Sequence, residues 1–185
     1  IFGEHNLQNL QGALHICEAL GLPREKFYAS IQSFKGAAKR QEIIVQHDTG
    51  VLYRDFAHAP SKVSATVKAV KEQFKEHKVT AILELHTFSS LTPEFIVGYK
   101  GAMDAADEAI VYFNPEAVAH KKLAPLSEKI VKDAFANKNI LVTTDSDSIF
   151  DNQQKNFGDK DVLLIMTSGN FHGKNLEEEA KKILD

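Results

Sequence analysis

The feature that most constrains the fold of this chain is an alternation, from residue 43 onwards, of short apolar runs with segments of helical periodicity. Short runs rich in Val, Ile and Leu are typical of buried strands, whereas apolar residues three or four positions apart indicate amphipathic helices. Strands that alternate with helices form mostly parallel sheets with right-handed crossovers. We therefore expect an α/β fold with a mostly parallel sheet of about six strands and flanking helices. The expected strands are residues 43–45, 51–53, 79–85, 109–113, 140–142 and 162–166, and the expected helices are residues 60–77, 93–106, 127–136, 145–154 and 175–184.

A helical hairpin is expected before the first strand. A stripe of leucines and Cys17 at helical spacing ends at Gly21, a residue type that often ends helices. A second apolar stripe after Pro23 predicts another helix, which closes at Gly36. The first two strands are then joined at Asp48-Thr49-Gly50, a hairpin turn signal. We expect a domain boundary near residues 36–39.

The composition excludes several classes of function. The chain has 185 residues, a net charge of −3 and no cluster of basic residues, so nucleic acid is not expected as a partner. The single cysteine, Cys17, cannot form a disulfide within the chain and fits a reducing cytosol, so we expect a cytoplasmic protein. No apolar run has the length of a membrane span, and no membrane partner is expected. The chain begins without Met, and we expect it to be part of a larger protein.

The residues from Tyr53 to Thr66 predict a strand end, a tight loop and the first turn of a helix. Pro60 suits the first turn of a helix, where its missing N–H costs nothing. Asp55 and His58 would then lie at the carboxyl end of a strand beside a helix N-terminus, where open α/β sheets bind ligands and anions are favoured. Asp55 can accept two ribose hydroxyls, and His58, the candidate catalytic residue, can donate to a phosphate or carboxylate. The alternative is that Asp55 caps loop amides and His58 makes a loop hydrogen bond.

Two further polar clusters are candidate nucleotide contacts. In His5-Asn6-x-x-Asn9 the two amides stand about one helical turn apart. An amide offers both the donor and the acceptor that an adenine edge requires, although Asn6 can equally serve as a helix N-cap. Arg40, near the expected domain boundary, can hold phosphate oxygens bidentately or can be a solvated linker charge.

The loop from Gly169 to Asn175 is not expected to cradle phosphate. It has one residue too few between its glycines for a Walker A loop, and Asn175 replaces the Ser or Thr. We expect a strand-to-helix loop that lines a pocket. The eight histidines show no structural zinc spacing, so no protein-made metal site is expected.

Three short motifs follow one another in a set order along the chain. They are His5-Asn6-x-x-Asn9, then Phe34-Lys35-Gly36 with Lys39-Arg40-x-Glu42, then Asp55-Phe56-Ala57-His58-x-Pro60. This ordered set resembles the Mur ligases, ATP-dependent amide-forming enzymes of peptidoglycan synthesis. That family has a UDP-sugar-binding domain, a central ATPase domain with a P-loop and a C-terminal Rossmann-like domain. The resemblance implies that residues 1–38 are the helical end of the central ATPase domain and that residues 39–185 are the C-terminal domain.

Within the family, the chain most resembles ligases that join the murein tripeptide L-alanyl-γ-D-glutamyl-meso-diaminopimelate to UDP-N-acetylmuramate in peptidoglycan recycling. The run from Met166 to Gly173 is similar to a Met-Ser-Asn-Gly-Gly-Phe-Gly-Gly pattern at the end of the final strand. The chain departs from the pattern at Ala59, where a second His is usual, and at His86-Thr87, where an Arg is often found. Glu116 replaces the Arg of an Asp-Asn-Pro-Arg motif, which argues against the diaminopimelate-adding ligase.

The resemblance also implies roles for individual residues. His5, Asn6 and Asn9 would face adenine, Asp55 the ribose and Arg40 the phosphates of ATP, while the P-loop, the Mg²⁺ ligands and the UDP-sugar site would lie outside this chain. The incoming peptide would meet Ser168, Gly169, Asn170, Phe171 and His172. The reaction would pass through an acyl phosphate on the lactyl carboxylate, and the chain alone would be inactive. Two alternatives stand beside this hypothesis: an L-alanine-adding or other Mur ligase, and a non-catalytic α/β interaction module.

Overall fold

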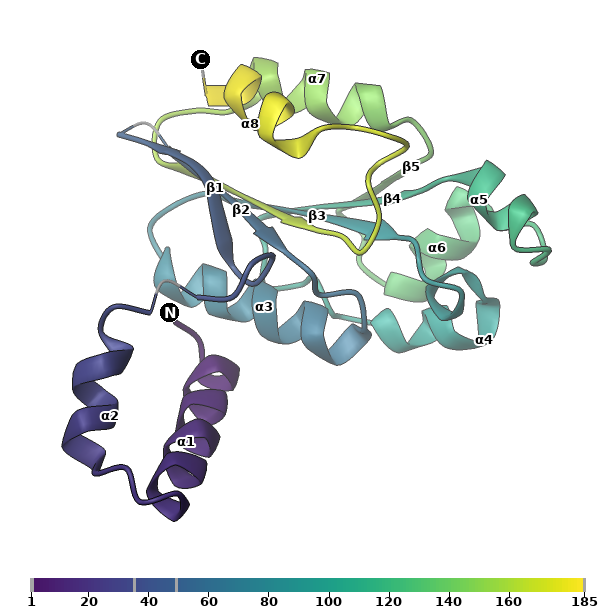
Figure 1. The fold of residues 1–185 in the computed structure, drawn as a ribbon. Coiled ribbons are helices and arrows are strands. Elements are labelled where there is room, and N and C mark those ends of the chain that lie inside the picture. The colour runs from purple at the N-terminus through teal and green to yellow at the C-terminus, as the bar shows by residue number, and fades with distance from the viewer. Residues whose placement is uncertain (1, 35, 49, 185) are drawn as a thin grey trace.

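A six-stranded sheet forms the centre of the molecule, with helices packed on both of its faces (Figure 1). The computed structural model describes residues 2–34, 36–48 and 50–184. The strands are β1 (Glu42–His47), β2 (Gly50–Asp55), β3 (Val79–Leu85), β4 (Glu108–Phe113), β5 (Ile140–Thr143) and β6 (Asp161–Met166). The helices are α1 (Glu4–Ala19), α2 (Arg24–Ile31), α3 (Pro60–Gln73), η1 (Ser89–Leu91), α4 (Pro93–Ile96), η2 (Val97–Tyr99), α5 (Pro115–His120), α6 (Glu128–Phe135), α7 (Ser146–Asn156) and α8 (Leu176–Leu184).

The strand order is β1-β2-β6-β3-β4-β5, which confirms the expected α/β class and the mostly parallel sheet. β1 and β2 pair antiparallel, and every other neighbouring pair is parallel. The expected hairpin between the first two strands is therefore present, although Thr49 of its turn lies outside the described residues. β6, the last strand along the chain, lies between β2 and β3 and pairs with both.

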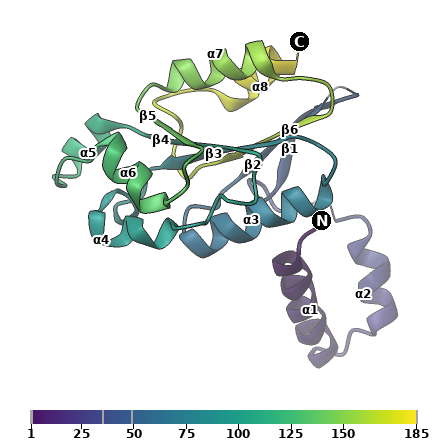
Figure 2. The same cartoon turned by 180° about the vertical axis from the view of Figure 1, so that it is seen from behind.

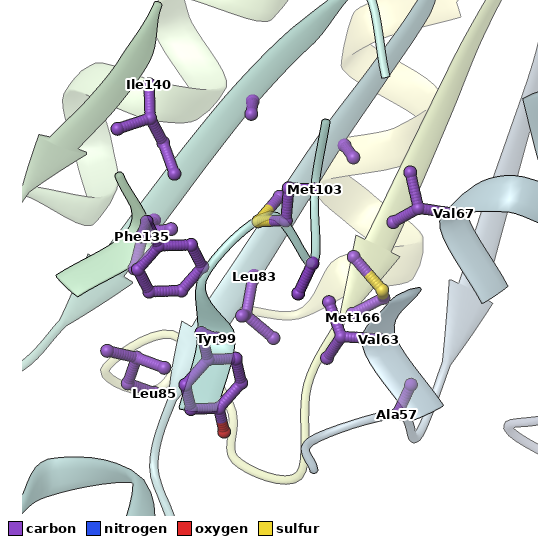
Figure 3. Close-up of a cluster of buried hydrophobic side chains, with 14 of the residues drawn as sticks. Ala57, Val63, Val67, Leu83, Leu85, Tyr99, Met103, Phe135, Ile140 and Met166 are labelled. Carbon is purple, nitrogen blue, oxygen red and sulfur yellow. The ribbon is translucent and has the colours of Figure 1, made fainter. Parts of the chain in front are cut away.

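The two faces of the sheet carry separate hydrophobic cores. On one face, α3, α4 and α6 cover a cluster that includes Val67, Leu83, Tyr99 and Met166, as Figure 3 shows. On the other face, α7 and α8 cover a cluster that includes Ile82, Phe150 and Phe171 (Figure 2). Neighbouring residues of one strand point to opposite faces, so a strand covered on both faces is buried throughout. This is why the expected strands appear in the sequence as continuous apolar runs.

The connections on either side of β6 diverge to opposite faces at the carboxyl edge of the sheet. The chain leaves β2 for α3 on one face, whereas it leaves β6 for α8 on the opposite face (Figures 1 and 2). The chain also leaves β3 for the face that carries α3. In open α/β sheets, ligands bind where neighbouring strands send their connections to opposite faces. The candidate residues after β2 and β6 lie at this edge.

The hairpin of α1 and α2 projects away from the sheet (Figure 1). Its base is attached through Phe2, whose ring packs edge-on against Tyr53, with 5.8 Å between the ring centroids, and against Phe74, with 6.4 Å. Gly3 allows this close approach: its φ is +90°, and a Cβ there would lie 2.6 Å from the Cβ of Ala69 on α3. The expected helical hairpin is confirmed, although α2 ends at Ile31 rather than at Gly36.

Helix boundaries differ from expectation at two further places. The expected helix over residues 93–106 is wrong beyond η2: Lys100 leaves the helical region, Gly101 has a φ of +70°, and the N–H of Gly101 donates to the carbonyl of Phe135 over 3.1 Å. A tertiary hydrogen bond thus replaces a helical one. α3 ends at Gln73 rather than near 77, because Phe74 turns its ring onto Tyr53.

α5 was not expected from the sequence. It begins at Pro115, and the side-chain oxygen of Asn114 caps it by accepting from the N–H of Glu116 over 2.8 Å. An Asn followed by a Pro is a typical start of a helix, so Asn114-Pro115 could have predicted α5 from the sequence.

Candidate functional site

Asp55, the last residue of β2, has both carboxylate oxygens bonded to the main chain. One oxygen accepts from the N–H of Ala57 over 2.6 Å, and the other accepts from the N–H of Gln41 over 2.8 Å. The residue is only 3% exposed. Burial raises the pKa of Asp55 above its ordinary value, and the two amides and the charges of Arg40 and His5 offset only part of that effect. The loop-capping alternative for Asp55 is therefore present in the structure, while two of its four lone-pair positions remain for other donors.

The segment before β1 wraps around Asp55 and Phe56 in an irregular conformation. Lys39 and Gln41 have positive φ angles of 58° and 43°, and the carbonyl of Lys39 accepts from the N–H of Phe56 over 2.8 Å. Glu42 closes the segment by accepting from the N–H of Lys39 over 2.8 Å, and this bond, together with Arg54, lowers the pKa of Glu42. The Lys39-Arg40-x-Glu42 motif is thus a folded turn rather than a solvated linker. Lys35, in the preceding motif, lies outside the described residues.

Three of the expected nucleotide residues are brought to this turn. The amide nitrogen of Asn6 donates to the side-chain oxygen of Gln41 over 2.8 Å, which links α1 to the Asp55 loop. The guanidinium of Arg40 lies 5.5 Å from the centre of the Phe56 ring, a cation–π distance. Asn6 also donates to the carbonyl of Phe2 over 2.9 Å, so it does not act as the N-cap of α1, which begins after Gly3.

His5 and Asn9, two of the residues expected to face adenine, differ in their placement. His5 is half-buried and close enough to influence Asp55, whereas Asn9 is exposed on α1. The structure therefore gathers His5, Asn6, Arg40 and Asp55 around one turn and leaves Asn9 one helical turn further out.

His58 lies in the loop that leads into α3. Its Nδ1 is 2.9 Å from the carbonyl oxygen of Phe56, and since a carbonyl only accepts, Nδ1 carries the proton. In the neutral ring, Nε2 then presents a lone pair, so His58 donates from Nε2 only when the ring is charged. The carbonyl of His58 accepts from the hydroxyl of Tyr99, whose pKa is raised by burial. These contacts fix both the backbone and the ring of His58.

The loop after β6 begins beside the Asp55 loop. Ser168 has a buried hydroxyl for which the described residues supply no hydrogen-bond partner. Gly169 lies so close to His86, the residue after β3, that a Cβ there would be 2.6 Å from Nδ1 of His86. Asn170 is exposed, and its side-chain oxygen accepts from the N–H of Gly173 over 3.1 Å.

Phe171, one of the expected peptide contacts, lies with its side chain in the core of the molecule. Its side chain is fully buried, stacked on Tyr112 with 5.4 Å between the centroids and packed edge-on to Phe150 at 5.5 Å. The ring therefore belongs to the core under α7 and α8. A left-handed backbone, with a φ of 46°, turns the ring inward.

His172, by contrast, is exposed and meets α5. Its Nδ1 lies 2.8 Å from the amide nitrogen of Asn114. The side-chain oxygen of Asn114 is occupied by the N–H groups of Glu116 and Ala117, so its nitrogen faces His172 and donates. Because Nδ1 of His172 then accepts, Nε2 carries the proton in the neutral ring. His172 thus presents an N–H at the exposed edge of the loop.

Sequence reasoning missed Gln41, Glu84 and Asn114 as members of these sites. Gln41 has a buried side-chain nitrogen without a hydrogen-bond partner in the described part of the chain. Glu84 is 3% exposed near the end of β3. A single acidic residue within an otherwise apolar run was the available signal for Glu84, since a buried charge needs dedicated partners. Gln41 offered no comparable signal.

Among the described residues, no group of three or more His, Cys, Asp or Glu side chains is arranged to hold a metal ion. None of the helices in residues 2–34, 36–48 and 50–184 combines the length and the apolar character that a membrane crossing requires.

The chain is similar to known ligases in sequence. Residues 39–169 match the family model described as "Mur ligase, glutamate ligase domain". The UDP-N-acetylmuramate–L-alanine ligase of Chlorobaculum parvum is 30% identical over 174 residues, which is 91% of this chain and 37% of that protein. The ligase of the same name from Caldanaerobacter subterraneus subsp. tengcongensis is 30% identical over 184 residues, which is 97% of this chain and 39% of that protein. The chain thus spans less than two fifths of the length of these relatives.

Two solved structures share the fold. UDP-N-acetylmuramate–alanine ligase from Thermotoga maritima superposes with a TM-score of 0.72 at 16% identity, over 100% of this chain and 38% of its own. A murein peptide ligase from Psychrobacter arcticus superposes with a TM-score of 0.65 at 20% identity, over 98% of this chain and 36% of its own. With the family match over most of the sheet domain, the chain belongs to the Mur ligases and contains their C-terminal domain.

Proposed function

We propose that the full-length protein joins L-alanine to UDP-N-acetylmuramate in the bacterial cytoplasm at the expense of ATP. The observation that carries this proposal is the 30% identity, over 91% and 97% of the chain, to two UDP-N-acetylmuramate–L-alanine ligases. In the proposed reaction the lactyl carboxylate takes the γ-phosphoryl group of ATP, which leaves ADP and an acyl phosphate. The amine of the amino acid then attacks the acyl carbon, the amide bond forms, and inorganic phosphate leaves.

The turn around Asp55 is proposed to hold the nucleotide. Asp55 would accept the ribose hydroxyls, Asn6 and the buried nitrogen of Gln41 would face the base, and Arg40 would meet the phosphates. An unpartnered buried donor beside a buried carboxylate fits a ligand that supplies both hydroxyls and ring acceptors. The described residues form no acidic cluster for Mg²⁺, and we assign its ligands to the upstream domains.

His58, the candidate catalytic residue, is proposed to orient a phosphate or carboxylate as a charged ring. Its Nδ1–H is held by Phe56 and its carbonyl by Tyr99, so Nε2 has one fixed direction. A preoriented donor stabilises developing negative charge more than a mobile one does.

The loop of residues 168–172 is proposed to receive the amino acid or peptide that carries the attacking amine, here called the acceptor. Ser168, Gly169 and Asn170 would line it with backbone and polar groups, and His172 would offer its Nε2–H. The murein tripeptide is the second candidate acceptor, favoured by the likeness of the run from Met166 to Gly173 to the pattern of tripeptide ligases.

Residues 1–38 are proposed to be the end of the central ATPase domain. The hairpin exposes Ile16 by 65%, Leu20 by 82% and Tyr28 by 47%. A hollow of about 250 Å³ between α1 and α2 is lined by Leu7, Leu10, Gln11, Leu14, His15, Arg24, Phe27 and Tyr28. An apolar helical surface of this kind is expected to pack against a further part of the protein.

The experiment that tests the proposed function supplies the full-length protein with ATP, Mg²⁺ and UDP-N-acetylmuramate, and varies the acceptor. ADP release and the mass of the product are measured with L-alanine and with the tripeptide. Preference for L-alanine supports the proposal, and preference for the tripeptide supports the second candidate. If ADP is released with neither L-alanine nor the tripeptide, the proposed function fails. The present chain alone serves as the control and should release no ADP.

A further inference from the structure

Glu84 is a buried acidic residue at the carboxyl end of the central strand β3. It is 3% exposed and lies on the face of the sheet that α7 and α8 cover, because it alternates with Ile82 of that core. The residue paired with Glu84 on the neighbouring strand β4 is Tyr112. A carboxylate in such a place is costly unless donors surround it, so its partners indicate why it is there.

In the described part of the chain, the hydrogen-bond donors to Glu84 come from the loop after β6, and Nδ1 of His86, just after β3, lies 3.7 Å from Oε1 of Glu84. Oε1 accepts from the main-chain N–H of Phe171 over 3.1 Å. Oε2 accepts from the hydroxyl of Thr167, and that hydroxyl in turn accepts from the N–H of Gly169 over 2.8 Å. One carboxylate therefore fixes three positions of a single loop. Its own burial keeps it away from a ligand.

The loop needs such a fixed point because its backbone is in an unfavourable conformation. Phe171, His172 and Gly173 have consecutive positive φ angles of 46°, 61° and 89°. Residues with a Cβ rarely adopt this left-handed region, and two in succession persist only when their surroundings hold them. Two features stabilise one side of the turn. The N–H of Phe171 donates to Glu84, and the ring of Phe171 is buried.

The consequence of the turn is the position of His172. The left-handed residues direct the ring of Phe171 into the core and the ring of His172 outward to Asn114. Gly169 is pressed against the same carboxylate, since a Cβ there would lie 2.7 Å from Oε2 of Glu84 and 2.6 Å from Nδ1 of His86. Loss of Glu84 would remove the bonds that hold the hydroxyl of Thr167 and the N–H of Phe171, while the N–H of Thr167 keeps its bond to the carbonyl of Asp55.

We infer that Glu84 positions the acceptor indirectly. It does so by holding the loop of residues 167–173 in its left-handed turn. The inference rests on the proposed function, in which this loop receives the acceptor. Glu84 bonds to this loop and not to the turn around Asp55, so its removal should weaken acceptor binding and leave ATP binding unchanged.

Two substitutions separate the hold on the loop from mere occupation of space. Glu84→Ala removes both carboxylate oxygens that accept hydrogen bonds from the loop. Glu84→Gln keeps one oxygen for the N–H of Phe171, and its amide can donate to the hydroxyl of Thr167, which has two lone pairs. In the full-length enzyme, Glu84→Ala should raise the KM for the acceptor about tenfold, as expected when hydrogen bonds to a charged group are lost. Glu84→Gln should restore most of that loss, and the KM for ATP should not change in either variant.

Thr80→Val is the matched control. Thr80 is 4% exposed at the opposite end of the same strand, and its hydroxyl donates to Glu108 over 3.2 Å. Thr80→Val removes a buried side-chain hydrogen bond from β3 and leaves the loop intact. The KM for the acceptor and the KM for ATP should both stay unchanged. Equal rises in the KM for acceptor and ATP in Glu84→Ala, or the same effect in Thr80→Val, would overturn the inference.

Hydrogen exchange of the peptide that spans residues 167–175 gives a readout independent of ligation. In the full-length protein without substrates, exchange should be faster in Glu84→Ala and unchanged in Thr80→Val. If wild type ligates no acceptor, the proposed function fails, and this exchange still decides whether Glu84 holds the loop. Unchanged exchange, or faster exchange with an unchanged KM for the acceptor, would overturn the inference. If Glu84→Ala does not fold, Thr167→Val carries the same tests, because it removes the hydroxyl and leaves Glu84 in place.

Discussion

The main-chain N–H of Thr167 donates to the main-chain carbonyl of Asp55 over 3.0 Å. This hydrogen bond continues the parallel pairing of β2 with β6 by one position beyond Asp55 and Met166. It joins the first residue after β6 to the residue whose side chain anchors the proposed nucleotide turn. The two proposed sites are therefore neighbours at one sheet edge, and each can be perturbed separately through its side chains.

The first prediction concerns Asp55→Asn in the full-length enzyme. The amide offers one acceptor oxygen where the carboxylate offers two, and its NH₂ would face the N–H of Gln41 or Ala57. We expect the KM for ATP to rise about tenfold, which corresponds to the loss of one hydrogen bond to a charged group. Steady-state kinetics with ATP varied at saturating acceptor measures the effect.

Asp161→Asn is the control for this prediction. Asp161 also caps a backbone amide, that of Gly158 at 2.9 Å, but it lies at the start of β6, at the opposite edge of the sheet. It should leave the KM for ATP unchanged. If Asp55→Asn lowers the melting temperature and leaves the KM for ATP as in wild type, Asp55 only caps its loop.

The second prediction concerns His172→Ala. The substitution removes an exposed ring that is fixed by Asn114 and leaves the core untouched. We expect a higher KM for the acceptor, by about fivefold to tenfold for a lost hydrogen bond, and an unchanged KM for ATP. His120→Ala, at an exposed position of α5, is the matched control. A wild-type KM for the acceptor in His172→Ala would show that the loop is only a connection.

The third prediction concerns Phe171→Ala and follows from the burial of its ring. Removing a fully buried ring that contacts Tyr112 and Phe150 should lower the free energy of unfolding by about 3–5 kcal/mol. Chemical denaturation measures the change. Phe88, which is 59% exposed, provides the control: Phe88→Ala should change the free energy of unfolding by less than about 0.5 kcal/mol. Similar small effects from both variants would contradict the burial of Phe171.

The fourth prediction concerns the pH dependence of stability at Asp107. Its carboxylate accepts from Nζ of Lys71 and from the N–H of Val79, each over 2.7 Å. Burial raises the pKa of Asp107, but the hydrogen bond from Lys71, the Val79 amide and the charge of Lys71 outweigh it, and the pKa lies below its ordinary value. The stabilisation is therefore present above the unfolded pKa of about 3.9 and is lost as the pH falls through the folded pKa.

Asp107→Asn should lower the free energy of unfolding at pH 7 by about 0.5–1 kcal/mol, a value limited by the 40% exposure of the side chain. The difference from wild type should shrink as the pH falls below about 4. Asp133→Asn, in the exposed pair with Lys129, is the control and should leave the free energy of unfolding close to that of wild type. A difference for Asp107→Asn that grows in acid would contradict the assignment.

Much of the fold could be predicted because burial on both faces appears directly in the sequence. The run of residues 79–85 is apolar apart from Thr80 and Glu84, and it forms β3 as expected. The position of β6 between β2 and β3 could not be predicted, because an apolar run does not specify its neighbours. The break after Tyr99 was missed because it depends on a hydrogen bond from Gly101 to Phe135, distant in the chain.

The candidate site was predictable in its residues more than in its contacts. Asp55 and His58 lie between a strand end and a helix start as expected, because Pro60 in the sequence predicts the start of the next helix. The amide of Gln41 on Asp55 could not be foreseen, because it requires a positive φ at Gln41. The inward ring of Phe171 follows from a left-handed turn in residues that carry a Cβ, and sequence gives no sign of such a turn.

The central place of β6 has a consequence for biosynthesis. Val51 and Val79 both pair with Val162, so β2 and β3 leave the ribosome long before the strand that belongs between them. Until Asp161–Met166 emerges, each of these two strands presents an unpaired hydrogen-bonding edge, and such edges invite pairing with other chains. Long-range parallel pairing is also slow to form. A ribosome that pauses before residue 161 would therefore hold a nascent chain in its most aggregation-prone state.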